Sequence, residues 1–292
     1  MAQCAQTITC AHDCLRDGIE ENSRGDLWKA TPKTGAGTDV ADQIGFAGMR
    51  RKKKQRRGLS VFQLKVIGAV ALVLSAGSTT LVPLIFGSDT SNMTSLTAMV
   101  LCEVVSWFAA PIYAWLLVQG FQQTRNRVAY GVQLLLLALI AEVPYDLATS
   151  GKPFDFGSQN PVFGLFIAFA MLAAMKWVAQ RYQGAMLVIS DIVLVVVAVL
   201  WDLLLRVGLR QHLMSLGAVT LGFVLIFWLM RSRENTMMFT AGLFGAVMMI
   251  APGVGVAFVH YYNGKLGYKH SWTKWMFYAF YPVILLICAA VA

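Results

Sequence analysis

Long apolar stretches separated by short polar segments make up most of the chain after residue 60. A helix of about 20 mainly apolar residues crosses a hydrocarbon core of about 30 Å, and each stretch is long enough to form such a helix. The stretches lie at residues 61–86, 95–119, 128–147, 161–179, 185–205, 212–230, 237–260 and 275–291. This pattern predicts an all-α membrane protein, a polytopic bundle of about eight transmembrane helices with a range of about seven to nine.

The first 48 residues have neither a helical nor an alternating apolar period. We interpret residues 1–58 as a disordered tail and residues 59–292 as the transmembrane domain. The tail ends in the basic run MRRKKKQRRG, which begins at Met49 and directly precedes the first apolar stretch. Under the positive-inside rule this run predicts a cytoplasmic N-terminus, and Met49 is an alternative start of translation.

The composition supports a membrane location. Hydrophobic residues make up 57% of the chain and charged residues only 13%, against about 25% charged residues in soluble domains. We therefore expect a multi-pass protein of the cell (plasma) membrane whose main partner is the lipid bilayer. The net charge of +9 is explained by basic residues at the ends of the apolar stretches, so no nucleic-acid partner is expected.

One basic loop contradicts this simple topology. With eight crossings and a cytoplasmic start, the loop that holds Lys265, Lys269 and Lys274 falls on the outer side, against the positive-inside rule. Either one apolar stretch is re-entrant or these lysines have a function. In the same region, the turn at Asn263 and Gly264 is either an anchored connection or part of a site that binds phosphate or carboxylate groups.

Carboxylates inside apolar stretches are the main candidates for chemistry, because a charge at the centre of a bilayer costs at least about 2.5 kcal/mol. Glu103 lies in the second stretch, and Glu142 and Asp146 share one helical face near the end of the third. The pair is either a site for protons, cations or amines, or a helix end that faces water, with Pro144 ending the helix.

Metal chemistry has little support in the sequence. The cluster of Cys10, His12 and Cys14 matches no standard zinc-binding pattern, and no second pair of ligands follows it. We therefore expect no metal cofactor.

Several motifs together resemble a known family. They are LKVIGAVALVLS in the first stretch, PIYAWLLVQGFQQTRN at the end of the second, AEVPYDL in the third, NPVFGL opening the fourth, and YNGKLG followed by FYAFYP at the last. Over residues 61–289 the chain resembles the TraX family, which is named for the conjugation protein that acetylates the N-terminus of F-type pilin.

The resemblance implies a helical bundle related to membrane acyltransferases. Such a protein would take an acetyl group from cytoplasmic acetyl-CoA and deliver it to a peptide N-terminal amine or a hydroxyl of a surface glycan. Among the matching residues, Glu142 is the candidate catalytic base. The candidate substrate-binding residues are Asp146, Asn160, Asn263, Lys265 and Tyr281.

Other positions differ from the family pattern. The resemblance places an Asp-His pair where this chain has Ser75 and Ala76, a Glu at Gln119, and a His at Val283. Two alternatives to acyl transfer therefore stay open. One is a non-catalytic relative that takes part in surface or conjugative assembly. The other is a small transporter that uses Glu142 and Asp146, although the chain has no visible inverted repeat.

Overall fold

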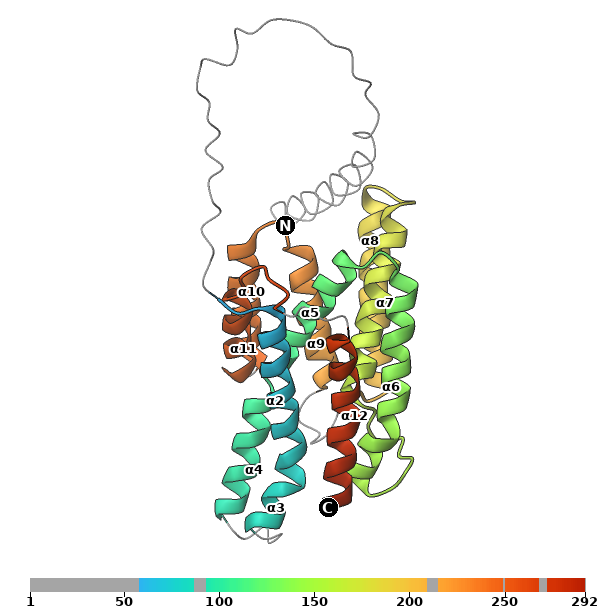
Figure 1. Cartoon of the computed structure of the whole chain (residues 1–292). Helices are drawn as coiled ribbons and strands as arrows, with labels where there is room; N and C mark the ends of the chain where they lie inside the picture. The colour runs from blue at the N-terminus through green and yellow to red at the C-terminus, as the bar shows by residue number, and fades with distance from the viewer. Residues whose placement is uncertain (1–57, 87–92, 209–214, 249, 268–271, 292) are drawn as a thin grey trace, which may run out of the picture. The chain divides into compact units, whose positions relative to one another are not determined.

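The computed structural model describes residues 58–86, 93–208, 215–248, 250–267 and 272–291 (Figure 1). Residues 59–292 form one compact unit. The interpretation of residues 1–57 as a disordered tail with a basic run, the alternative start at Met49, and the cluster at Cys10 lie outside the described residues.

The described part of the chain is helical and has no strands, only two isolated bridges. Its helices are α2 (Val61–Thr79), α3 (Leu81–Phe86), α4 (Met93–Ser106), α5 (Ala109–Gln123), α6 (Arg127–Ser150), α7 (Pro161–Ala179), α8 (Ala185–Leu204), α9 (Leu216–Leu229), α10 (Glu234–Met248), α11 (Ile250–His260) and α12 (Thr273–Val291). The prediction of an all-α fold is confirmed.

Five helical segments are long and apolar enough to cross a membrane. They are Val61–Ser78, Met93–Gln123, Arg127–Ser150, Pro161–Ala179 and Ala185–Leu204. Three shorter apolar helices accompany them, at Leu216–Leu229, Ile250–His260 and Trp275–Val291. Together with the composition, these segments identify a multi-pass membrane protein.

The second predicted stretch is interrupted in its middle. A turn at Trp107 and Phe108 separates α4 from α5. Pro111 explains the break, because it has no N–H to donate to the Trp107 carbonyl and its ring clashes with that group. The N–H of Ala110 bonds to the Trp107 carbonyl instead, at 3.3 Å. A Cβ on Gly255 of α11 would lie 2.5 Å from the Phe108 carbonyl oxygen, so α11 packs directly against the break.

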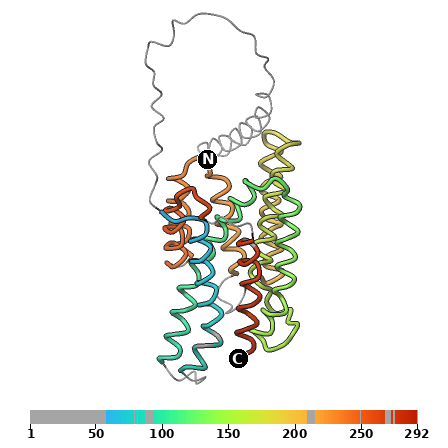
Figure 2. Tube along the Cα trace, in the orientation of Figure 1, coloured from blue at the N-terminus to red at the C-terminus, as the bar shows by residue number. Residues whose placement is uncertain are grey.

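The stretch predicted at 237–260 is two helices, α10 and α11, which lie side by side (Figure 2). A Cβ on Gly245 would lie 2.7 Å from the backbone nitrogen of Gly253, a contact that requires the chain to fold back between them. At about 1.5 Å per residue, α10 and α11 are about 22 Å and about 16 Å long. Each helix alone is shorter than a hydrocarbon core of about 30 Å, and the two together form a hairpin, which is the shape that a re-entrant stretch would have.

The hairpin changes the position of the basic loop. The N–H groups of Leu59 and Asn263 bond to the carbonyls of Tyr261 and Leu59, at 2.8 and 2.9 Å. The N–H of Val61 bonds to the Lys265 carbonyl at 2.9 Å. Eight straight crossings would place this loop at the end of the bundle opposite to the start of α2, whereas its described part, residues 261–266, lies beside the start of α2. The physical reason is that the α10–α11 hairpin returns the chain to the end from which it entered.

Cysteine labelling tests this arrangement. In a chain without its five natural cysteines, we introduce Arg125→Cys, Lys152→Cys or Lys265→Cys, all at exposed positions. We expect Cys at 125 and 265 to react alike with a membrane-impermeant maleimide on intact cells, and Cys at 152 to behave oppositely. Equal labelling at 152 and 265, with a different result at 125, would contradict the re-entrant hairpin.

Two glycines of α10 provide a matched pair for a packing test. A methyl group on Gly245 would press on the backbone of Gly253, whereas one on Gly242 would meet nothing within 4 Å. We expect Gly245→Ala to lower the free energy of unfolding by about 1–3 kcal/mol through overpacking. Gly242→Ala should leave it unchanged or slightly higher, because alanine favours a helix. Thermal unfolding in detergent measures both, and equal effects would refute the close contact.

Candidate functional site

The structure brings together two of the candidate residues, Glu142 of α6 and Asn160 at the start of α7. The side-chain nitrogen of Asn160 donates to Glu142 Oε2 at 2.6 Å and to the Ala138 carbonyl at 2.8 Å, and its backbone N–H donates to the same carboxylate oxygen at 3.2 Å. Asn160 Oδ1 accepts from the N–H of Val162 at 2.9 Å and so caps α7. Since Asn160 is fully buried, these bonds satisfy polar groups that would otherwise lack hydrogen-bond partners inside the bundle.

Asp146 holds the same α6–α7 connection at a second point. Its carboxylate is buried, and Oδ2 accepts from the backbone N–H of Asp155 at 2.9 Å. The prediction that Glu142 and Asp146 share a helical face is confirmed. Pro144 does not end the helix, however: α6 continues to Ser150 and closes at Gly151, which adopts φ 69°. The sequence interpretation of a helix end at Pro144 is therefore wrong, because helix packing on both sides of the proline keeps α6 intact.

The remaining predicted site residues lie in two different places. Tyr281 belongs to the same buried cluster as Ala138, Ala141 and Tyr145 of α6. Asn263 and Lys265 lie instead in the turn that pairs with the start of α2, where Asn263 Oδ1 accepts from the N–H of Lys265 at 3.0 Å. The turn is therefore built by its own hydrogen bonds and is not joined to the Glu142–Asn160 pair.

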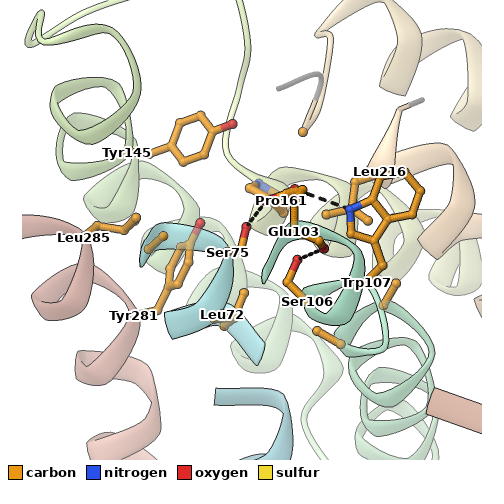
Figure 3. A pocket seen from close by; sticks show the side chains of 14 residues that line it. Leu72, Ser75, Glu103, Ser106, Trp107, Tyr145, Pro161, Leu216, Tyr281 and Leu285 are labelled. Carbon is orange, nitrogen blue, oxygen red and sulfur yellow. Dashed lines mark hydrogen bonds between the residues drawn. The ribbon is translucent and has the colours of Figure 1, made fainter. Parts of the chain in front are cut away.

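A third carboxylate, Glu103, lies at the centre of another polar cluster (Figure 3). Its Oε2 accepts from the hydroxyls of Ser75 at 3.3 Å and Ser78 at 3.1 Å, both on α2. Its Oε1 accepts from Trp107 Nε1 at 3.3 Å. The α4–α5 break places Trp107 at this point, and helical spacing places Ser75 and Ser78 on one face of α2.

Glu103 borders a small cavity of about 70 Å³. We call it the Glu103 cavity, and its polar lining consists of Ser75, Glu103, Ser106, Trp107, Tyr145 and Tyr281. The hydroxyls of Tyr145 and Tyr281 point towards the same space as Ser75 (Figure 3). Ala76, the neighbour of Ser75, also lines the cavity. The two positions where the resemblance places an Asp-His pair therefore face this space.

A larger cavity of about 430 Å³ adjoins the first, and we call it the central cavity. The two share the lining residues Leu72, Ala109, Ala110, Pro161, Leu216 and Tyr281. The central cavity reaches from the start of α2 at Val61 to Pro161 in the middle of the bundle. Polar side chains line it, namely Lys65, Tyr113, Gln119, Gln123, Thr124, Tyr130, Gln133, Thr220 and Tyr278. Such a mixed lining suits an elongated ligand that carries amide and charged groups.

Sequence reasoning identified Glu103 as a charge at membrane depth but did not connect it with the serines. The local signal was present: Glu103 and Trp107 are four residues apart on one helix face, and Ser75 and Ser78 are three apart on another. The contact between the two faces joins residues 28 positions apart. No short-range pattern predicts such a pairing.

Removing the Asn160 side chain tests the structural role of the Glu142–Asn160 pair. Asn160→Ala deletes two donors and one cap acceptor around a buried carboxylate, so we expect a loss of about 3 kcal/mol in the free energy of unfolding. Asn126→Ala is the control, because Asn126 caps the exposed start of α6 through one bond to Ala129; about 1 kcal/mol is expected there. Denaturant unfolding in mixed micelles compares the two, and similar losses would contradict the proposed anchor.

Comparison with known proteins gives two matches. A sequence profile described as TraX protein matches residues 64–292. The probable fimbrial assembly protein FimC, serogroup H1, of Dichelobacter nodosus is 27% identical over 247 residues, which cover 79% of this chain and 95% of that protein. No solved structure matches the chain.

Proposed function

The chain belongs to the TraX family, and from this membership and the Glu103 cavity we propose that it is a membrane acyltransferase. Acetyl-CoA is the acyl donor, and the acceptor is a peptide N-terminal amine or a glycan hydroxyl. The observation that carries the proposal is the position of the Glu103 carboxylate, bonded to two serine hydroxyls and an indole N–H beside the junction of two cavities.

Acyl transfer requires a group that accepts a proton. An amine or hydroxyl that attacks the thioester carbonyl must lose a proton, and the departing thiolate must gain one. Glu103 is placed to take the first proton and return it to the thiolate. General-base catalysis of this kind contributes about 10²- to 10⁴-fold to a rate. In this proposal Glu103 supplies the proton transfer, whereas Glu142, which is bonded to Asn160, keeps the bundle in shape.

The central cavity is the proposed binding site for the donor. Acetyl-CoA supplies the activated acyl thioester. Lys65 lines the cavity near the start of α2, and exposed Arg125 directly follows the lining residue Thr124. These cations suit the phosphates of the donor. Gln119 and Gln133 can bond to the amides of its pantetheine arm, and the shared lining residue Leu72 lies where the acyl group would pass into the Glu103 cavity.

The charge distribution suggests which side faces the cytoplasm. Lys176 lies within electrostatic range of both Arg127 and Arg231. Tyr130, three residues after Arg127 on α6, lines the central cavity together with Val61. Lys265 pairs with the start of α2 at that end. Under the positive-inside rule we infer that this end and the N-terminus are cytoplasmic, with about seven crossings plus the α10–α11 hairpin. The donor would then enter from the cytoplasm.

A second candidate function is a non-catalytic partner in the assembly of a surface fibre. The name of the similar Dichelobacter nodosus protein and the presence of Ala76 in the Glu103 cavity favour it. The two proposals differ in whether Glu103 is needed for chemistry. Transport through Glu142 and Asp146 has less support, because both carboxylates are engaged in holding the α6–α7 connection.

A glutamine substitution separates the two candidates. Glu103→Gln keeps the size and shape of the side chain but replaces one accepting oxygen by an NH2 donor and removes the proton acceptor, so we expect transfer of labelled acetyl from acetyl-CoA to membrane vesicles to fall at least about 100-fold. Glu234→Gln, an exposed position at the start of α10, is the matched control with unchanged transfer. If wild-type protein neither binds acetyl-CoA nor transfers acetyl, the non-catalytic function holds.

A further inference from the structure

Ser75 occupies the position that a covalent acyl carrier requires. We propose that Ser75 is the nucleophile of the reaction and holds the acyl group as an ester between donor and acceptor. The inference rests on the proposed transferase function and goes beyond it. It assigns a two-step mechanism and a covalent modification site to this chain.

Two serines bond to Glu103, and only one of them can meet a substrate. Ser75 Oγ donates to Glu103 Oε2, and Ser75 lines the Glu103 cavity. Ser78 donates to the same oxygen but is 2% exposed and lines neither cavity. Its hydroxyl also bonds to the Ser75 carbonyl at 2.7 Å. Ser78 therefore orients the carboxylate, and Ser75 is the hydroxyl within reach of an acyl group.

The position of Ser75 along α2 connects it with the proposed donor site. Leu72 lies three residues earlier on the same helix face and lines both cavities. An acyl group that passes Leu72 from the central cavity arrives next at Ser75. The neighbouring Ala76 has only a methyl side chain, so it leaves space beside the hydroxyl for the acyl group.

The surroundings of Ser75 provide the other groups that nucleophilic catalysis needs. Glu103 is the base, and Trp107 Nε1 fixes its second oxygen at 3.3 Å. The oxyanion that forms during attack requires hydrogen-bond donors. Tyr281 directs its hydroxyl towards the same space (Figure 3), whereas the Tyr145 hydroxyl shares a hydrogen bond with Ser158 Oγ at 3.3 Å. This places a nucleophile, a base, an orienting group and one candidate oxyanion donor, Tyr281, around one cavity.

Each of the two steps forms one bond to the acyl carbon, breaks another and returns the proton that Glu103 accepts. Ser75 Oγ forms a bond to the acyl carbon and gives its proton to Glu103, while the carbon–sulfur bond breaks and the thiolate takes that proton and leaves as a thiol. In the second step the acceptor amine or hydroxyl attacks the ester carbonyl and gives its proton to Glu103. The ester bond breaks, and Ser75 Oγ recovers the proton.

Isotope exchange tests the covalent step without any acceptor. Purified full-length protein in nanodiscs is incubated with acetyl-CoA and labelled CoA, and the label that enters acetyl-CoA is measured. An acyl-serine makes this exchange possible because its formation is reversible in the presence of the thiol. We expect exchange by the wild type, a loss of at least about 100-fold in Ser75→Ala, and retention within about tenfold in Ser78→Ala, where Glu103 keeps two of its partners.

Peptide mapping after incubation with labelled acetyl-CoA gives a second readout, with Ser75→Cys as the conservative variant. Acetyl recovered on Ser75 in the wild type and on the cysteine in Ser75→Cys supports the proposal. Transfer to membrane vesicles that persists in Ser75→Ala, with no exchange and no labelled peptide in the wild type, overturns the acyl-serine and leaves the transferase function standing. Absence of acetyl-CoA binding, exchange and transfer in the wild type overturns both.

Discussion

The hydrogen bonds between Asn160 and Glu142 determine how the centre of the bundle is built. Asn160 ends an irregular segment that enters the protein interior, where an unsatisfied polar group costs several kcal/mol. Bonds to Glu142 and Ala138 remove that cost and fix the start of α7. The adjoining Gln159 exchanges backbone hydrogen bonds with Arg206 and Gly208, so the α8–α9 connection is held in the same place. Pro161 and Leu216, which follow these two connections, form part of the boundary between the two cavities.

The interruptions of the apolar helices have physical causes that also serve the site. Pro111 forces the α4–α5 break, which directs Trp107 towards Glu103. Gly255 lets α11 pack on that break. The α10–α11 hairpin in turn brings the 261–266 segment back to the start of α2, close to the cytoplasmic end in the proposed topology. Non-helical backbone at membrane depth is tolerated here because it is buried in protein or borders a cavity.

The carboxylates of this chain illustrate two reasons for placing charge inside a membrane protein. Glu142 and Asp146 accept bonds from the α6–α7 connection and stabilise a buried irregular segment. Glu103 accepts bonds from side chains that face a cavity. The cost of burial is similar in kind for both, yet the partners differ, and the partners determine whether a carboxylate is available to a substrate. In the proposed function the most prominent pair in the sequence therefore has a structural role, and the single glutamate is the proposed proton acceptor.

The sequence by itself determined the helical class, most of the apolar segments, the shared face of Glu142 and Asp146, and the family. These properties depend on composition and on local periodicity and motifs, and such local signals extend over only a few turns of one helix. Only the tertiary structure decided that Ser75 meets Glu103, that Lys265 lies beside the start of α2, and that residues 237–260 fold back on themselves. Each of these depends on contacts between separate helices, some of which, such as α10 and α11, have glycines that allow close packing. Such contacts follow from how whole faces fit together, which no local pattern specifies.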